Sequence, residues 1–238
     1  MSDARKPPPP PAVELATPPF AGVALDPAPR LQGKRVTLCV TGSIAAYKAV
    51  VLLRLLRKEG AEVEVVLSRS ATQFVGAATF AGLNGRPPFL DMFSPAGGEL
   101  HVELGGCSDL LLIVPATADV IARLAAGRAD DLIAALALAS RCPVLIAPAM
   151  HPNMWDHPAT QRNVGALLAD GRVSFVGPTV GEVASGDVGQ GRMAEPEVML
   201  ARTVAALRAA TLGGRHLVVT AGPTAEDLDP VRYFGNRS

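Results

Sequence analysis

Small and hydroxyl-bearing side chains follow three short apolar runs of this chain, at the points where those runs end. Gly42 and Ser43 follow the first run, Ser68 follows the second, and Thr117 follows the third. A glycine and a hydroxyl at the start of a helix leave backbone N–H groups that can bind an anion. Small side chains also allow a planar ring to approach the backbone. The pattern predicts a site for a phosphate-bearing planar cofactor; a simple capped turn at Ser43 is the alternative.

Two later loops carry side chains suited to an anionic substrate. The loop 147–155 holds His151, Asn153, two methionines and the only tryptophan, and two prolines stiffen it. A rigid polar loop after a strand favours substrate binding. The segment 184–193 has three glycines in six residues and then Arg192, a side chain that clamps carboxylate or phosphate. This segment is predicted to be a lid that closes over the substrate, with a flexible surface hairpin as the alternative.

His101 is the candidate for proton transfer. It precedes the third apolar run, and an imidazole takes or gives a proton near neutral pH. The alternative is a surface histidine in a loop.

Composition excludes several classes of protein. Hydrophobic residues make up 49% of the chain, which is too many for a wholly disordered protein. The formal net charge of zero argues against nucleic acid as the main partner. The three cysteines form no CxxC pair, so no metal site is predicted. The apolar stretch 121–140 carries four charged residues and does not match a membrane span, so a cytoplasmic protein without membrane contact is expected.

Strand and helix patterns alternate from residue 34 onward. Strands are predicted at 35–41, 62–67, 110–114, 143–147 and 173–176. Helices are predicted at 43–60, 118–126, 130–139, 155–169 and 195–210. This alternation predicts an α/β fold: a doubly wound parallel sheet flanked by helices, in a three-layer sandwich. Ligands of such sheets bind beyond the carboxyl ends of the strands, where the candidate residues lie.

The two ends of the chain differ from this central unit. Residues 1–33 hold nine of the 21 prolines, five of them consecutive, and are predicted to be a disordered tail. Residues 34–212 form the predicted cofactor-binding domain. A further strand is predicted at 216–220, and residues 213–238 are predicted to be the start of a second, truncated domain, because one strand and one loop cannot bury a core.

Four motifs lie in one unbroken series along residues 34–210. They are 41–48, 115–119 with 126–132, 148–150 with 154–155, and 186–193. Together they resemble the flavin-containing cysteine decarboxylases, a family with a flavodoxin-like fold, and above all the decarboxylase half of the bacterial bifunctional enzymes of coenzyme A synthesis. Residues 220–224, 229–233 and 236–238 are similar to the opening of the ligase domain of those enzymes.

The resemblance implies FMN as cofactor and assigns roles by motif position. His101 matches the active-site histidine, the segment 185–193 matches the substrate clamp, and a homotrimer or a multiple of three is implied. The implied FMN-binding residues are Gly42, Ser43, Ile44, Ser68, Pro115, Ala116, Thr117, Ala118, Ala149 and Met150. The implied substrate-binding residues are His151, Asn153, Met154 and Arg192.

The implied reaction is decarboxylation of 4'-phosphopantothenoylcysteine to 4'-phosphopantetheine in coenzyme A biosynthesis. One alternative is an oxidative decarboxylase of a C-terminal peptidyl cysteine, which releases the enethiol without reducing it. Another is a non-catalytic FMN-binding protein that binds a partner through its fold and proline-rich tail. A flavodoxin-like electron carrier is a third.

Two residues depart from the usual pattern of the family. His151 stands where an asparagine is usual, and we expect imidazole, or Asn153, to donate to the substrate carboxylate instead. Ser185 stands where a cysteine acts as the acid of the final step. A hydroxyl is a far poorer acid than a thiol of pKa ~8.5, so the final reduction is expected to use water or to fail.

Overall fold

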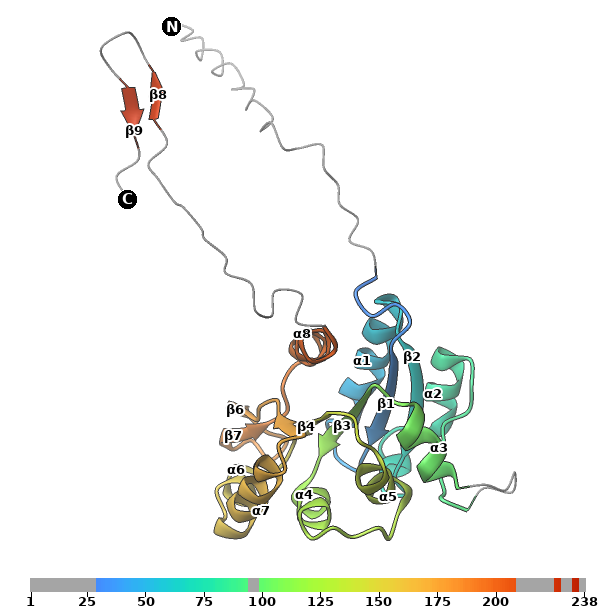
Figure 1. Ribbon diagram of the computed structural model, residues 1–238. Helices are drawn as coiled ribbons and strands as arrows, with labels where there is room; N and C mark the ends of the chain where they lie inside the picture. The colour runs from blue at the N-terminus through green and yellow to red at the C-terminus, as the bar shows by residue number, and fades with distance from the viewer. Residues whose placement is uncertain (1–28, 94–98, 209–224, 228–232, 236–238) are drawn as a thin grey trace, which may run out of the picture.

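A five-stranded parallel sheet forms the centre of the molecule. The computed structural model describes residues 29–93, 99–208, 225–227 and 233–235. The strands are ordered β2-β1-β3-β4-β5, and every neighbouring pair is parallel (Figure 1). This order confirms the predicted doubly wound sheet. The strands are β1 (Arg35–Val40), β2 (Glu62–Leu67), β3 (Leu110–Ala116), β4 (Val144–Pro148) and β5 (Val173–Phe175).

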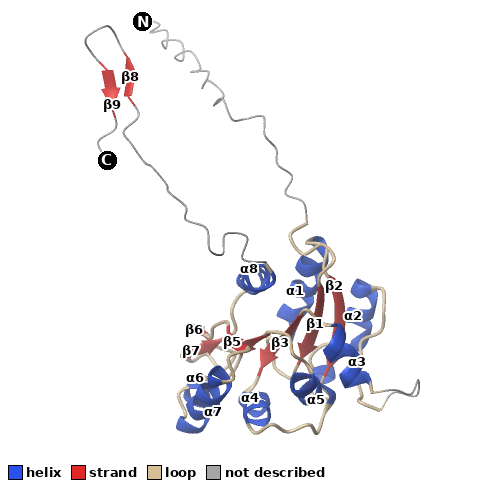
Figure 2. Cartoon of the chain, in the orientation of Figure 1, coloured by secondary structure: helices blue, strands red, loops and turns tan. Residues whose placement is uncertain are grey.

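Helices cover both faces of this sheet, as Figures 1 and 2 show. Alternate residues of β3 point to opposite faces because a strand has a period of two. Leu112 packs in the cluster that includes residues of α1 and α8, whereas Ile113 packs with residues of α4, α5 and α7. The helices are α1 (Ala46–Lys58), α2 (Ala77–Asn84), α3 (Leu100–Cys107), α4 (Ala118–Ala125), α5 (Leu132–Ala139), α6 (Pro152–Trp155), α7 (Pro158–Ala169) and α8 (Pro196–Leu207), with a short 3₁₀ helix at Ala71–Gln73.

Three local predictions need correction. Ser43 does not cap α1, because the helix begins at Ala46 and the Ser43 hydroxyl accepts only the Ala45 N–H, at 3.3 Å. The helix predicted at 155–169 begins later, at Pro158, because Trp155 ends α6 and His157 caps α7 with its ring nitrogen. His101 lies in α3, within a helix and not in a loop.

The folded unit also begins earlier than predicted. Leu31 belongs to the predicted tail, yet its side chain is fully buried. Arg30 forms an ion pair with Glu59 at 2.5 Å, and this pair lowers the pKa of Glu59 to about 2. These contacts attach residues 30–31 to the end of α1.

A two-stranded antiparallel hairpin follows the main sheet. It consists of β6 (Thr179–Glu182) and β7 (Val188–Arg192), and it contains the glycine-rich segment that was predicted to be a lid. Two further short strands, β8 (Ala225–Asp227) and β9 (Tyr233–Gly235), pair antiparallel. The strand predicted at 216–220 lies outside the described residues. Of the helices in the described ranges, none is both long and apolar enough to cross a membrane.

Candidate functional site

The carboxyl ends of neighbouring strands are joined into one continuous edge. Thr41, after β1, donates its hydroxyl to the Pro115 carbonyl of β3 at 2.6 Å. The Ala149 N–H, after β4, donates to the Ala116 carbonyl at 2.9 Å. Gly42 approaches Ser70 so closely that an added Cβ would overlap that side chain. The strand ends therefore converge, as the sequence predicted from the positions of its small and hydroxyl residues.

A hollow of about 640 Å³ opens at this edge, a size typical of ligand sites. Three segments line it: the start of α1, the loop after β4, and the β6–β7 hairpin. The structure therefore brings together residues that lie more than a hundred positions apart in the sequence. The predicted site residues that line it are Ser43, Ile44, Ala149, Met150, His151, Ser185 and Arg192.

The first side of the hollow offers both polar donors and an apolar surface. Among the described residues, the backbone N–H groups of Ser43 and Ile44 have no hydrogen-bond acceptor. The side chains of Ile44 and Tyr47 are 63% and 57% exposed and line the same hollow. Free N–H groups beside exposed apolar side chains fit a planar group that carries a phosphate.

The remaining predicted cofactor residues lie along the same edge, outside the lining of this hollow. Ser68 contacts Ser70 at 3.0 Å and lines a second hollow, of about 470 Å³. Pro115 and Ala116 end β3. Thr117 caps α4 through its hydroxyl, which accepts the Val120 N–H at 3.4 Å, and Ala118 begins that helix.

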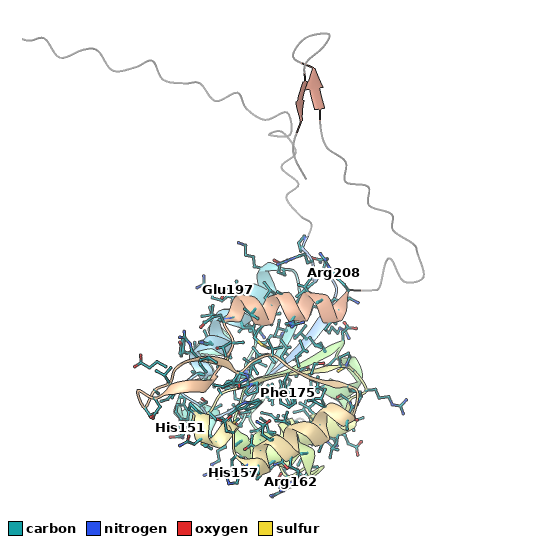
Figure 3. The ribbon with its side chains drawn as sticks, turned by 90° about the vertical axis from the view of Figure 1, so that its left-hand side faces the viewer. His151, His157, Arg162, Phe175, Glu197 and Arg208 are labelled. Carbon is teal, nitrogen blue, oxygen red and sulfur yellow. The ribbon has the colours of Figure 1, made fainter. Side chains whose placement is uncertain are left out.

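A carboxylate joins the two residues that depart from the family pattern. The Ser185 hydroxyl donates to Asp187 Oδ2 at 2.7 Å, and His151 Nε2 lies 2.9 Å from the same oxygen. The hydrogen bond from Ser185, followed by that from His151, lowers the pKa of Asp187 below its usual range. Figure 3 shows His151 beside the projecting hairpin. The tip of the hairpin is thereby attached to the loop after β4.

A second cluster attaches the base of the hairpin. The Lys48 ammonium is buried and donates to the Met193 carbonyl and to Glu195 Oε1, each at 3.0 Å. Arg192 contacts the same carboxylate oxygen at 2.8 Å. The bonds from Lys48 and then Arg192 lower the pKa of Glu195. Arg192, predicted to bind a substrate anion, is thus already paired.

Three other predicted residues do not line the first hollow. His101 lines a separate hollow with Met92 and Leu138, between α3 and α5. Asn153 and Met154 lie on α6, where the Asn153 N–H donates to His151 Nδ1 at 3.2 Å. A single copy of the chain therefore does not bring His101 to the hollow that contains His151.

Sequence reasoning overlooked Lys48, Asp187 and Glu195. One signal was present for Lys48, because Leu52 and Leu56 follow it at intervals of four residues and place it on the buried face of α1. The two carboxylates have no comparable periodic signal, since Asp187 lies in the glycine-rich segment and Glu195 lies just before α8.

Comparison with known proteins gives the same family for most of the chain. The model of the family "Flavoprotein" matches residues 27–208, and that of the "DNA/pantothenate metabolism flavoprotein C-terminal domain" matches 212–238. The chain is 48% identical over 210 residues to the coenzyme A biosynthesis bifunctional protein CoaBC of Mycobacterium tuberculosis, covering 86% of this chain and 50% of that protein. The Bacillus subtilis protein of the same name is 44% identical over 213 residues, covering 87% and 52%. The chain thus spans about half the length of the curated relatives it matches.

Solved structures agree with this comparison. The FMN-dependent cysteine decarboxylase SpaF has a TM-score of 0.63 and 32% identity, covering 74% of this chain and 97% of its own. A PPC decarboxylase variant in complex with pantothenoylaminoethenethiol has a TM-score of 0.63 and 30% identity, covering 71% and 96%.

Proposed function

Because this chain belongs to the flavoprotein family, we propose that it binds FMN and decarboxylates 4'-phosphopantothenoylcysteine to 4'-phosphopantetheine in coenzyme A biosynthesis. One observation carries the proposal: the start of α1, the loop after β4 and the glycine-rich hairpin enclose a single hollow at the carboxyl edge of the sheet. The match of residues 212–238 to the C-terminal domain supports a bifunctional parent enzyme.

The edge of the sheet is the proposed FMN site. Gly42, Ser43, Ile44 and Ser68 would hold the phosphate end, because they offer N–H groups and hydroxyls. The ring would lie along residues 115–118 and 149–150, where the chain carries mostly small side chains. When bound, the cofactor supplies the two-electron chemistry that decarboxylation of a cysteine requires, by removing and later returning a hydride.

The residues around the hollow have distinct proposed roles. His151 and Arg192 bind the substrate carboxylate, with Asn153 and Met154 supporting the loop. The hairpin covers the bound substrate and excludes water. Ser185 faces the hollow from the hairpin, but its hydroxyl is a weak acid, so water is the proposed proton source for the final reduction.

His101 is proposed to act in proton transfer from a neighbouring copy of the chain. It lines a different hollow from His151, and the exposed apolar side chains of Val102 and Leu138 lie on the helices around it. Burial of these side chains against a second copy would be favourable. A homotrimer, or a multiple of three, is the proposed assembly, and light scattering of the FMN-loaded protein measures it.

A variant of His101 tests the proposed function directly. We expect His101→Asn to abolish CO2 release from 4'-phosphopantothenoylcysteine while the flavin absorption spectrum stays unchanged. His157→Asn is the matched control, because asparagine is a good N-terminal helix cap and can still accept a hydrogen bond from the first turn of α7. Unchanged CO2 release in His101→Asn would contradict the proposed role of His101, and no CO2 release from the FMN-loaded wild type would favour a non-catalytic FMN-binding protein. A stable reduced flavin with no CO2 from the wild type would indicate an electron carrier.

The oxidative decarboxylation of a peptidyl cysteine is a second candidate, which Ser185 favours. Oxidative decarboxylation leaves the double bond of the enethiol in the product. That product is two daltons lighter than the reduced product of the same substrate. Mass spectrometry after a single anaerobic turnover separates the two reactions. Restoration of the heavier product by Ser185→Cys would show that the hydroxyl limits the reductive step.

A further inference from the structure

Asp187 already binds the imidazole that is proposed to receive the carboxylate of the substrate. Its Oδ2 lies 2.9 Å from His151 Nε2. His151 Nδ1 accepts the Asn153 N–H at 3.2 Å, so the neutral ring carries its proton on Nε2 and donates it to Asp187. Both ring nitrogens are engaged within the chain. Another carboxylate can reach the Nε2 proton only after Asp187 has left it.

The cationic side chains that line the hollow are engaged as well. Lys48 and Arg192 both contact Glu195. Within the described part of the chain, every cationic or imidazole group that lines this hollow therefore has an acidic partner. Glu182 also lines the hollow, and no hydrogen bond or ion pair of its side chain is found among the described residues. A substrate carboxylate must compete with one of these internal carboxylates.

Asp187 is the easier of these carboxylates to displace. The pair between Glu195 and Arg192 is also exposed, but Glu195 is held by the buried Lys48 ammonium as well. The side chains of His151 and Asp187 are 32% and 58% exposed, whereas that of Lys48 is 6% exposed. An exposed hydrogen bond to a carboxylate contributes little net free energy, because water solvates both groups when the contact opens. The hydroxyl of Ser185 would continue to satisfy Asp187 when His151 leaves it.

The position of Asp187 on the hairpin agrees with such an exchange. It follows Gly186, which has a positive φ of 87°, in the turn between β6 and β7. The base of the hairpin is attached separately, by the hydrogen bond from the Met150 N–H to the Gly191 carbonyl at 3.0 Å. The turn can therefore move while the base stays in place.

We propose that Asp187 is a specificity-determining residue that occupies the place of the substrate carboxylate, an inference that rests on the proposed function. A ligand gains access to the His151 donor only if its own carboxylate displaces Asp187. Decarboxylation removes that group from the ligand. Asp187 then returns to His151, and the product, which has no competing carboxylate, leaves.

Two probes that differ only in the carboxylate test this inference. 4'-Phosphopantothenoylserine carries it, and 4'-phosphopantothenoylethanolamine lacks it; a hydroxyl in place of the thiol prevents turnover of both. We expect Asp187→Asn to bind the serine probe about two- to fivefold more tightly than wild type, as the weakening of an exposed contact with a carboxylate implies. The affinity for the ethanolamine probe should stay within twofold. Calorimetry on the FMN-loaded protein measures both affinities, and Asp187→Ala is a second variant.

The matched control is Glu182→Gln, which removes the same charge from the same hairpin and lines the same hollow. The inference is supported if Glu182→Gln changes the affinity for the serine probe less than Asp187→Asn does. An equal gain in the control would attribute the effect to net charge and overturn it. Weaker serine-probe binding by Asp187→Asn, or an equal gain for both probes, would also overturn it. If neither probe binds the wild type, the proposed function itself fails.

A spectroscopic readout examines the contact without reference to affinity. Saturation of the wild type with the serine probe should raise the pKa of Asp187 toward its ordinary value, because the bond from His151 is lost. Carbon-13 NMR of the aspartate carboxyls follows this change. An Asp187 signal that does not respond to the serine probe would contradict displacement.

Discussion

The β6–β7 hairpin is attached at its base and at its tip by contacts of different kinds. At the base, a buried Lys48 ammonium donates to the Met193 carbonyl and Glu195, and Gly191 lies against the loop after β4. At the tip, the exposed Asp187 contacts His151. Breaking the base leaves buried polar groups without partners, which is costly, whereas water replaces the partners at the tip. The comparison indicates a hairpin with a permanent base and an exchangeable tip.

The largest effect is expected when the base loses its close approach. In Gly191→Ala, the new Cβ would overlap the Met150 carbonyl oxygen and crowd the backbone of His151 and Pro152. Backbone atoms cannot move aside as a flexible side chain does, so we expect unfolding free energy to fall by about 2–3 kcal/mol. Urea unfolding measures it. Gly181→Ala is the matched control, because its Cβ meets only the Arg192 side chain, and its stability should change by less than about 0.5 kcal/mol. Equal losses of unfolding free energy in Gly191→Ala and Gly181→Ala would show that the close approach of Gly191 does not stabilise the base.

A smaller loss is expected from Lys48→Met. Methionine fills the buried space of the lysine stem but leaves the Met193 carbonyl without its donor. We expect the free energy of unfolding, measured in urea, to fall by about 1–2 kcal/mol. The pKa of Glu195 should rise, because the bond from Lys48 is the largest cause that lowers it. Lys58→Met, on the exposed end of α1, should change stability by less than about 0.5 kcal/mol. A wild-type-like Lys48→Met would show that the ammonium does not hold the base.

The smallest effect is expected at the tip, where it concerns titration more than stability. The bond from Ser185 is the largest cause that lowers the pKa of Asp187, ahead of the bond from His151. Ser185→Ala should therefore raise the pKa of Asp187 more than His151→Gln does. Carbon-13 NMR titration measures both values. The reverse order would show that the imidazole, and not the hydroxyl, dominates the contact.

The same carboxylate determines how the tip responds to pH. The folded-state pKa of Asp187 is lowered, so its contribution is present above the pKa of an unfolded aspartate, ~3.9, and is lost as pH falls through the folded value. The contact between tip and loop should persist at pH 5 and disappear in stronger acid. Chemical shifts of the His151 ring follow it, and loss of the contact already at pH 5 would contradict this assignment.

Much of the site could be predicted from local pattern. Apolar runs such as 110–114 are recognisable as strands buried on both faces, and their order implies which ends share an edge. The residues after those runs, including Ser43, Met150 and His151, do meet around one hollow. The hairpin was among the alternatives for the glycine-rich segment, since glycines tolerate tight turns.

Side-chain partners could not be predicted in this way. His151 was expected to be free for a substrate, yet it is paired with a residue 36 positions away. Arg192 is paired with Glu195, and His101 lies in another hollow. Each of these outcomes depends on which loops are in contact in the folded chain. The spacing of residues along the sequence does not indicate those contacts.

The order of strands and helices, the edge at which ligands bind and the types of residue along it are therefore determined by the sequence itself, because periodicity and parallel connections are local properties. Only the tertiary structure decided which of those residues share a hollow and which are already hydrogen-bonded to Asp187 or Glu195. The physical reason is that a hydrogen bond requires two groups within about 3 Å, a condition that folding alone meets for residues far apart in the chain.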